Sequence, residues 1–365
     1  MAQNALKETN NKQLLSMKKN KKNNFVCGID WLQYRGIFKF KDKVDELQSW
    51  QINDVFISKK DGRTSDFQSL YNVQYCDEDT GELIDFACIC ADWNFAEKLH
   101  KDLQVVKIYN HIFYMYEIDD IMAILNSFFY CEKIIRIDFY ADFKRFKNCE
   151  CQSLIKKVAN NDLLIKGGRT TQIISKNGKY ESATFGTRNT PVRCYIYNKT
   201  KELKQSGKQY IAEMHELNNL NPAESDVWRL EFSILQPNNI LLIQDNDECG
   251  TFAGLNMCKF NPARFFAIFQ ILVCRYFTFR TNSSRRKTQE FTPLLSEIIY
   301  PNVYLKRRKY MSKKVSRTNK TILKAIVKLN DELRTFRMQQ LNPEQINYFI
   351  HTRNLDRYAA EHLII

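Results

Sequence analysis

The sequence predicts an α+β protein with antiparallel sheets built from two pseudo-repeated β-α-β units, followed by a basic helical C-terminal region. Three observations lead to this prediction. Short alternating strands, turn residues and short helices fill residues 25–235. The segment 60–64 is echoed at 166–170, and each copy follows an Ile-Asp-aromatic stretch. Beyond about residue 260 the pattern becomes helical and basic.

Composition and charge divide the chain into three parts. Of the 365 residues, 44% are hydrophobic and 13% aromatic, too many for a disordered chain. The net charge of +14 lies mostly in residues 1–24, at about +5, and in residues 275–337, at about +13. We expect a basic disordered arm at 1–24, a folded body at 25–255 and a helical basic region at 256–365.

No export or membrane signal is visible. The N-terminus is polar and lysine-rich. The longest apolar run, 265–274, falls short of the roughly 20 residues that a membrane span needs, and predicts a buried helix instead. The 11 cysteines, an odd number without an export signal, predict reduced thiols. We therefore expect a cytoplasmic protein without membrane contact.

The first elements of the body follow from local pattern. Residues 25–40 are rich in β-formers and predict a strand, or a hairpin broken at Gly36. Residues 119–128 begin with two aspartates and continue at helical spacing, which predicts a helix. A strand at 134–140 and a short helix at 152–159 follow.

A run of strands comes next. Residues 170–176 and 180–186 flank Asn177-Gly178, a dipeptide typical of a two-residue hairpin turn. Further strands are expected at 192–198 and 227–234. In the C-terminal third we expect a helix at 319–338, a second one opening at Asn342-Pro343-Glu344, and a last short one from about 355.

Three of these strands combine an apolar face with an ionisable face. The ionisable faces hold, in chain order, Arg136, Asp138, Tyr140 and Asp142; Arg193, Tyr195, Tyr197 and Lys199; and Arg229, Glu231 and Ser233. If the three strands are neighbours, one face of the sheet collects carboxylates, guanidinium groups and tyrosines.

Two interpretations of this face stay open. The charges form cross-strand ion pairs, each worth a few tenths to about 1 kcal/mol. Alternatively, Asp138, Asp142 and Glu231 bind Mg²⁺ or Mn²⁺, which prefer oxygen ligands. Tyr197 would then lie near a metal-polarised phosphate, where the metal, Lys199 and Arg193 favour its phenolate form.

Four motifs occur in a suggestive order: Arg136-Ile-Asp138-Phe-Tyr-Ala-Asp142, Thr184-Phe-Gly-Thr-Arg188, Tyr195-Ile-Tyr197-Asn-Lys199 and Trp228-Arg229-Leu-Glu231-Phe. Together they resemble the trans-acting replication initiation factor family, which comprises rolling-circle initiators of plasmids and phages and related relaxases. The opening strand Gly28-Ile-Asp-Trp-Leu is also similar. The resemblance covers about residues 25–240 and leaves the last third unmatched.

This resemblance implies a nicking-joining catalytic domain at 25–255 with an RRM-like or ferredoxin-like pair of β-α-β units. In the family, a tyrosine attacks a phosphodiester of single-stranded DNA, forms a 5′-phosphotyrosyl link and releases a 3′-OH that primes rolling-circle replication. The implied partner is origin DNA, single-stranded or supercoiled, with a host helicase and a second copy of the chain as further candidates. A relaxase of a mobile element would use the same chemistry.

The site residues are carried over from the motifs. Tyr197 matches the tyrosine of the family's Arg-x-Tyr-x-Lys strand and is the expected nucleophile, with Lys199 beside it. Tyr195 stands where the family has arginine, so Tyr195 stays open as a nucleophile, as does Tyr180. Arg188 is a candidate contact for the scissile phosphate.

The basic C-terminal segment predicts DNA contact. Clustered lysines and arginines neutralise phosphates, and the interleaved tyrosines can stack on unpaired bases. The residues expected to bind DNA are Arg193, Arg229, Arg285, Arg286, Lys287, Lys306, Arg307, Arg308, Lys309, Lys313 and Lys314. Two alternatives remain: a non-enzymatic DNA-binding repressor or origin-binding protein, and a basic structural or RNA-binding protein.

Overall fold

The computed structural model describes residues 25–77, 80–94, 104–167, 170–188, 190–222, 225–237, 241–244, 252–253, 262–282, 289–295 and 303–305. All of them belong to the first of two units, Met1–Lys306 and Arg307–Ile365. The arm expected at 1–24 and the three helices expected after residue 318 lie outside the described residues. Within the described ranges, no helix is long and apolar enough to span a bilayer.

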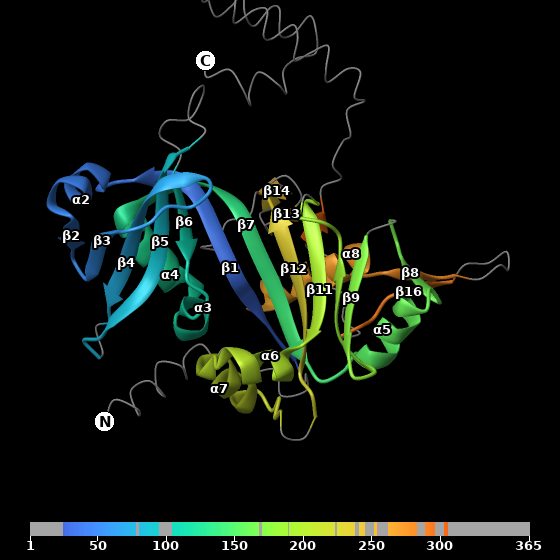
Figure 1. Ribbon diagram of the computed structural model, residues 1–365. Helices are drawn as coiled ribbons and strands as arrows, with labels where there is room; N and C mark the ends of the chain where they lie inside the picture. The colour runs from blue at the N-terminus through green and yellow to red at the C-terminus, as the bar shows by residue number, and fades with distance from the viewer. Residues whose placement is uncertain are drawn as a thin grey trace, which may run out of the picture. The chain divides into compact units, whose positions relative to one another are not determined.

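One antiparallel sheet of 11 strands, in the order β2-β3-β4-β5-β6-β1-β7-β12-β11-β10-β9, dominates the fold (Figure 1). Its first half consists of β1 (Phe25–Phe38), β2 (Ser49–Ile52), β3 (Val55–Lys60), β4 (Phe67–Cys76), β5 (Leu83–Trp93) and β6 (Gln104–Ile108). Its second half consists of β7 (Phe129–Phe143), β9 (Thr171–Lys176), β10 (Lys179–Phe185), β11 (Val192–Asn198) and β12 (Trp228–Leu235).

Helices and two small sheets complete the described chain. The helices are α2 (Lys41–Leu47), α3 (Ile112–Met115), α4 (Ile118–Phe128), α5 (Cys151–Ala159), α6 (Lys199–Ser206), α7 (Gln209–Leu217) and α8 (Pro262–Tyr276). One small sheet has the order β14-β13-β17, with β13 (Leu241–Gln244), β14 (Phe252–Ala253) and β17 (Val303–Leu305). The other has the order β16-β15-β8, with β8 (Leu163–Ile165), β15 (Phe279–Thr281) and β16 (Glu290–Phe291).

The antiparallel α+β class expected from the sequence is confirmed. The two halves do not form separate RRM-like sheets, because β1 and β7 pair at the centre and join all strands of both halves. In each half the last strand, β6 or β12, lies beside the first one. The first and last strands of each half therefore lie together at the middle of the sheet.

Strand β1 continues through Gly36, where a break was expected. A Cβ atom on Gly36 would lie 1.9 Å from the carbonyl oxygen of Tyr130 on β7. The glycine allows this close approach of two backbones, and the irregularity appears as a bulge between Arg35 and Gly36. Where the break was expected, the backbones of the paired strands β1 and β7 therefore approach each other closely.

The hairpin expected at Asn177-Gly178 is confirmed. Both turn residues have positive φ, 51° and 73°, as a two-residue turn of type I′ requires. They connect β9 to β10, which pair antiparallel. Asparagine and glycine tolerate this backbone conformation better than other residues, so the turn follows from local sequence.

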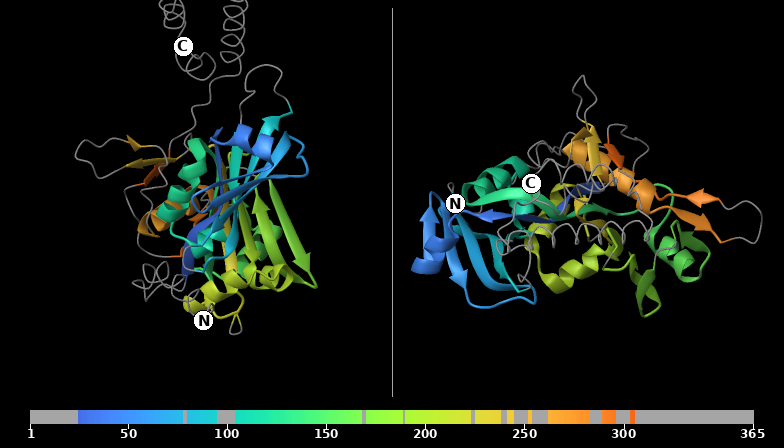
Figure 2. Two further views of the ribbon diagram at one scale, coloured as in Figure 1. Left: turned by 90° about the vertical axis from the view of Figure 1, so that its left-hand side faces the viewer. Right: turned by 90° about the horizontal axis from the view of Figure 1, so that it is seen from above.

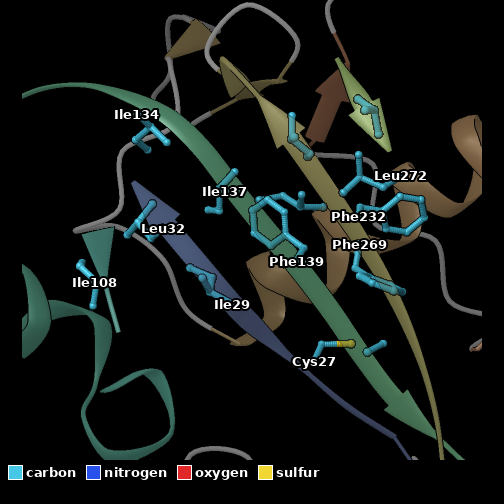
Figure 3. Close-up of a cluster of buried hydrophobic side chains, with 14 of the residues drawn as sticks. Cys27, Ile29, Leu32, Ile108, Ile134, Ile137, Phe139, Phe232, Phe269 and Leu272 are labelled. Carbon is cyan, nitrogen blue, oxygen red and sulfur yellow. The ribbon is translucent and has the colours of Figure 1, made fainter. Parts of the chain in front are cut away.

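Helices α4 and α8 cover one face of the sheet, called here the core face (Figure 2), and α5 joins the same apolar cluster beside β10. Figure 3 shows Phe269 and Leu272 of α8 beside Phe139 of β7 and Phe232 of β12. The helix expected at 265–274 is thus confirmed as buried. Because α8 fills this core, the body of the protein continues past the boundary expected at residue 255.

The opposite face, called here the polar face, is covered at one end. Helices α3 and α7 pack there through Tyr114, Ile211 and Met214, which contact Val26 of β1 and Tyr140 of β7. In Figure 1, α6 and α7 lie at the lower end of the sheet. This cover buries one end of the polar face.

Candidate functional site

The polar face of β1, β7, β12 and β11 carries residues in three rows that run across the strands. Pairing places Trp31, Asp138, Ser233 and Arg193 in the first row, Gly28, Tyr140, Glu231 and Tyr195 in the second, and Val26, Asp142, Arg229 and Tyr197 in the third. The three strands with ionisable faces are therefore neighbours, as the sequence analysis required for a shared polar face.

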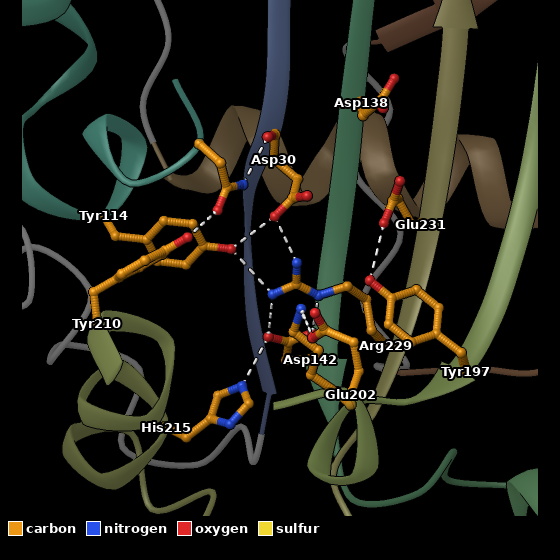
Figure 4. A network of polar contacts seen from close by, with 12 residues as sticks. Asp30, Tyr114, Asp138, Asp142, Tyr197, Glu202, Tyr210, His215, Arg229 and Glu231 are labelled. Carbon is orange, nitrogen blue, oxygen red and sulfur yellow. Dashed lines mark hydrogen bonds and ion pairs between the residues drawn. The ribbon is translucent and has the colours of Figure 1, made fainter. Parts of the chain in front are cut away.

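Arg229 is fully buried in the third row. Its Nε donates to Oδ1 of Asp142 at 2.6 Å, and a terminal nitrogen donates to Oδ2 at 2.7 Å. The other terminal nitrogen donates to Asp30 at 2.5 Å. The hydroxyl of Tyr114 accepts a further bond at 3.0 Å (Figure 4). The ring centroid of Tyr140 lies 4.0 Å from the guanidinium carbon.

Asp142 belongs to this buried network. Nε2 of His215 on α7 lies 2.8 Å from its Oδ2. Burial alone would raise the pKa of Asp142, but the charge of Arg229 and hydrogen bonds from Arg229 and His215 hold it well below its usual range. Both oxygens of Asp142 are engaged in this buried network, and its binding of a metal stays a prediction. The side chain of Arg229 has no exposed surface, and its contact with DNA stays a prediction.

Tyr197 and Glu231 meet on the polar face. The phenol hydroxyl of Tyr197 donates to Oε2 of Glu231 at 3.2 Å (Figure 4). Burial raises the pKa of Glu231 to about 8, helped by the nearby charges of Asp30 and Asp138. The structure thus places the expected nucleophile against a carboxylate that is an unusually strong base.

Burial also raises the pKa of Tyr197 well above its usual value, and the charge of Glu231 adds to the effect. Nζ of Lys199 lies 5.6 Å from the Tyr197 ring centroid, but it pairs with Glu202 at 2.5 Å, and burial lowers the pKa of Lys199. These surroundings do not favour a phenolate, and the effect expected of Lys199 and Arg193 stays a prediction. Tyr197 is a neutral phenol that needs a proton acceptor.

Asp138 is held by its neighbour Arg136 on the same strand. Nε and a terminal nitrogen of Arg136 donate to its two oxygens at 3.0 and 2.5 Å. Burial raises the pKa of Asp138 despite this pairing. Asp138 is 2% exposed, and its charge is close enough to raise the pKa of Glu231.

The expected metal ligands do not form one set. Asp138 and Asp142 are four residues apart on β7, which is roughly 13 Å at the usual rise per residue. That separation exceeds what two aspartates can bridge around one small cation. In the part of the chain that the structure describes, no three His, Cys, Asp or Glu side chains are grouped to hold a metal ion. Asp138 and Glu231 remain as two carboxylates on adjacent strands.

The two alternative tyrosines differ in position. Tyr195 lies directly opposite Glu231, on the polar face, with the guanidinium carbon of Arg193 4.7 Å from its ring centroid. Tyr180 packs against the cluster on the core face. Tyr195 therefore stays a candidate nucleophile, and Tyr180 does not.

Arg188 lies away from Tyr197. It is exposed in the turn before Val192, where β11 begins, whereas Tyr197 is close to the end of that strand. Five residues of strand span roughly 16 Å, which is more than one arginine side chain reaches. The prediction that Arg188 binds a phosphate held at Tyr197 is not supported by this placement.

One of the remaining basic residues lies on the polar face, and the others lie outside the described residues. Arg193 lies on the polar face, in the first row. The others expected to bind DNA lie outside the described residues: Arg285, Arg286, Lys287, Lys306, Arg307, Arg308, Lys309, Lys313 and Lys314. Their contact with DNA stays a prediction.

Sequence reasoning missed the parts that Asp30, Tyr114 and His215 play. Asp30 sits in a bulge between Ile29 and Trp31, which turns both Asp30 and Trp31 toward the polar face. The two apolar residues after Asp30 break the alternation and are the signal for this bulge. Tyr114 and His215 come from short helices whose contacts with the sheet leave no local pattern.

Comparison with known proteins gives a distant structural likeness and no sequence match. No known family matches the sequence, and no curated protein matches it. Among solved structures, the chain is similar to the rolling circle replication initiator protein from Geobacillus stearothermophilus, with a TM-score of 0.35 and 12% identity over 58% of this chain and 74% of that chain. A likeness this distant carries no argument about function.

Proposed function

We propose that the chain is a replication initiation protein that nicks one strand of origin DNA through Tyr197. The products would be a 5′-phosphotyrosyl intermediate and a free 3′-OH for rolling-circle replication. The observation that carries the proposal is the hydrogen bond of 3.2 Å between Tyr197 and Glu231. The motifs around Asp138, Tyr197 and Glu231, which resemble those of replication initiators, support the same reaction. A relaxase would use this site in the same way.

The chemistry follows from the two protonation states. As the Tyr197 oxygen forms a bond to phosphorus, its proton passes to Glu231, and the bond from phosphorus to the 3′ oxygen breaks. The departing 3′ oxygen takes a proton from solvent. A carboxylate with a pKa of about 8 is a far better acceptor for a phenol proton than an ordinary glutamate. Since the phosphotyrosine keeps the energy of the broken bond, rejoining needs no nucleotide.

A divalent cation is the second part of the proposal. Asp138 and Glu231 offer two carboxylates, and Mg²⁺ in proteins often uses one or two together with water and a substrate phosphate. A bound Mg²⁺ or Mn²⁺ would stabilise negative charge on the phosphate. Because a cation on Glu231 would lower the pKa of Glu231, the pH dependence of nicking reports whether Glu231 acts as base or as ligand.

We also propose that the two halves of the sheet are related copies of one unit. The support is the shared strand order, in which the first and last strands of each half lie at the centre. The proposed nucleophile and its proton acceptor both come from the second half. Strands β12 and β11 carry Glu231 and Tyr197, whereas β6 and β5 of the first half present Lys107 opposite Cys88.

The test uses the full chain and a supercoiled plasmid that carries its gene and flanking DNA, with Mn²⁺. We expect a protein–DNA band that survives denaturation, absent in Tyr197→Phe. Tyr180→Phe is the matched control, because this ring lies on the core face, and it should retain the band. A band lost in Tyr195→Phe but kept in Tyr197→Phe would identify Tyr195 as the nucleophile. No band with any divalent metal would favour a non-enzymatic DNA-binding protein and overturn the proposal.

A further inference from the structure

Two aromatic rings flank the carboxylates on the polar face. Trp31 lies on β1 and Tyr195 on β11, the outer two of four neighbouring strands, while Asp138 and Glu231 lie on the inner two. Three strand spacings separate β1 from β11, which is roughly 14 Å. The rings thus stand on both sides of the place where the phosphate would react.

Each ring has an arginine over it. The guanidinium carbon of Arg136 is 4.9 Å from the Trp31 ring centroid, and that of Arg193 is 4.7 Å from the Tyr195 centroid. Asp138 fixes Arg136 with two hydrogen bonds. The side chain of Arg136 is 33% exposed, and the other three residues are also partly exposed. Both pairs are therefore partly accessible, and that of Trp31 and Arg136 is also fixed by Asp138.

Two polar groups of these pairs lack a protein partner. Among the described residues, Nε1 of Trp31 and Nε of Arg193 are buried without a hydrogen-bond acceptor. An unpaired buried donor costs free energy, and such groups are rare in native proteins. Here both donors belong to the two stacked pairs on the outer strands.

The ligand that matches this arrangement is an unpaired strand of nucleic acid. Nucleobases stack on aromatic rings and on guanidinium planes, and arginines also attract the phosphates between them. A distance of roughly 14 Å holds about four nucleotides at the stacked rise of 3.4 Å and fewer when the strand is extended. In a duplex the base faces are already stacked on one another, so a duplex does not fit.

We propose that the pairs Trp31–Arg136 and Tyr195–Arg193 are stacking subsites for unpaired bases on the two sides of the reacting phosphate. The DNA strand would then cross β1, β7, β12 and β11, at right angles to the protein strands. This inference rests on the proposed function for its ligand, but its test does not depend on cleavage.

The test measures binding of labelled oligothymidine of about 12 nucleotides and of an abasic oligomer of equal length by fluorescence anisotropy. All proteins carry Tyr197→Phe, so that no adduct forms. We expect Trp31→Leu and Tyr195→Leu each to weaken oligothymidine binding by about ten-fold, and Trp31→Phe to retain most of the affinity. Affinity for the abasic oligomer should be the same in all variants, which also shows that they are folded.

Trp50→Leu is the matched control, because Trp50 also lies under a cation, Nζ of Lys43 at 4.2 Å, but on the edge strand β2. Its affinity for oligothymidine should not change.

Equal losses for both oligomers, or no loss in either leucine variant, would overturn the subsites. If the adduct forms but these affinities are unchanged, the proposed nicking activity is supported and the stacking subsites are overturned. If the affinities change as expected but no adduct forms, the stacking subsites are supported and the proposed nicking activity is overturned.

Discussion

Arg229 and Asp142 face each other across β12 and β7 as a doubly hydrogen-bonded ion pair without solvent exposure. Through Asp30 the pair reaches β1, and through His215 it reaches α7. The pair therefore ties the two central strands and a covering helix to β12, which carries Glu231 two residues from Arg229.

Breaking this pair should destabilise the fold strongly. Asp142→Asn removes one of the two carboxylates that pair with the buried guanidinium of Arg229, so we expect the free energy of unfolding in urea to fall by about 3–5 kcal/mol. The control is Arg145→Met, which removes an ion pair with Glu150 whose side chains are 71% and 61% exposed. The control should lose less than about 1 kcal/mol. Equally small losses in both variants would contradict the role assigned to the pair.

The stability of Glu231→Gln relative to the wild-type protein should increase as the pH rises. The folded state raises the pKa of Glu231 from 4.5 to about 8, so it binds this proton more tightly than the unfolded chain does. Wild-type stability therefore falls as the pH rises between these two values, and glutamine removes that loss. Thermal unfolding at pH 5 and pH 8 measures the difference, with Glu150→Gln as an exposed control. An advantage of Glu231→Gln that does not grow with pH would contradict the raised pKa.

The rate of nicking should rise with pH and level off above about 8, because Glu231 accepts the proton only when it is ionised. Asp138→Asn removes a neighbouring negative charge that raises this pKa, so the rise should move to lower pH. Single-turnover rates of adduct formation across the pH range give both profiles. A profile that stays in place in Asp138→Asn would argue against Glu231 as the base.

Gly36→Ala should weaken the pairing of the two central strands. Its Cβ would meet the carbonyl oxygen of Tyr130 at 1.9 Å and a ring carbon of Phe129 at 2.7 Å. Because backbone cannot move aside easily, we expect a loss of at least about 1–3 kcal/mol in urea unfolding. Gly28→Ala on the same strand meets only the ring of Tyr140, at 3.0 Å or more, and should cost less. A larger loss in Gly28→Ala than in Gly36→Ala would show that the backbones of β1 and β7 are not this close at Gly36.

Local sequence determined most of the elements around the site. Alternation defined the strand at 192–198, which the structure has as Val192–Asn198, and Asn177-Gly178 defined the hairpin of β9 and β10. These are properties of a few neighbouring residues, so no tertiary contact was needed to predict them. The same alternation correctly assigned Asp138, Tyr197 and Glu231 to one face of their strands.

Only the tertiary structure decided what each of these side chains does. By alternation alone, Asp142 and Arg229 are equivalent to Asp138 and Arg193. They differ because α3 and α7 cover one end of the polar face and bury the first two in an ion pair. The bulge at Asp30 likewise brings a further carboxylate to the site. Burial and the distances between strands depend on segments far apart in the chain, and these set the proton affinity of Glu231 that the proposed chemistry uses.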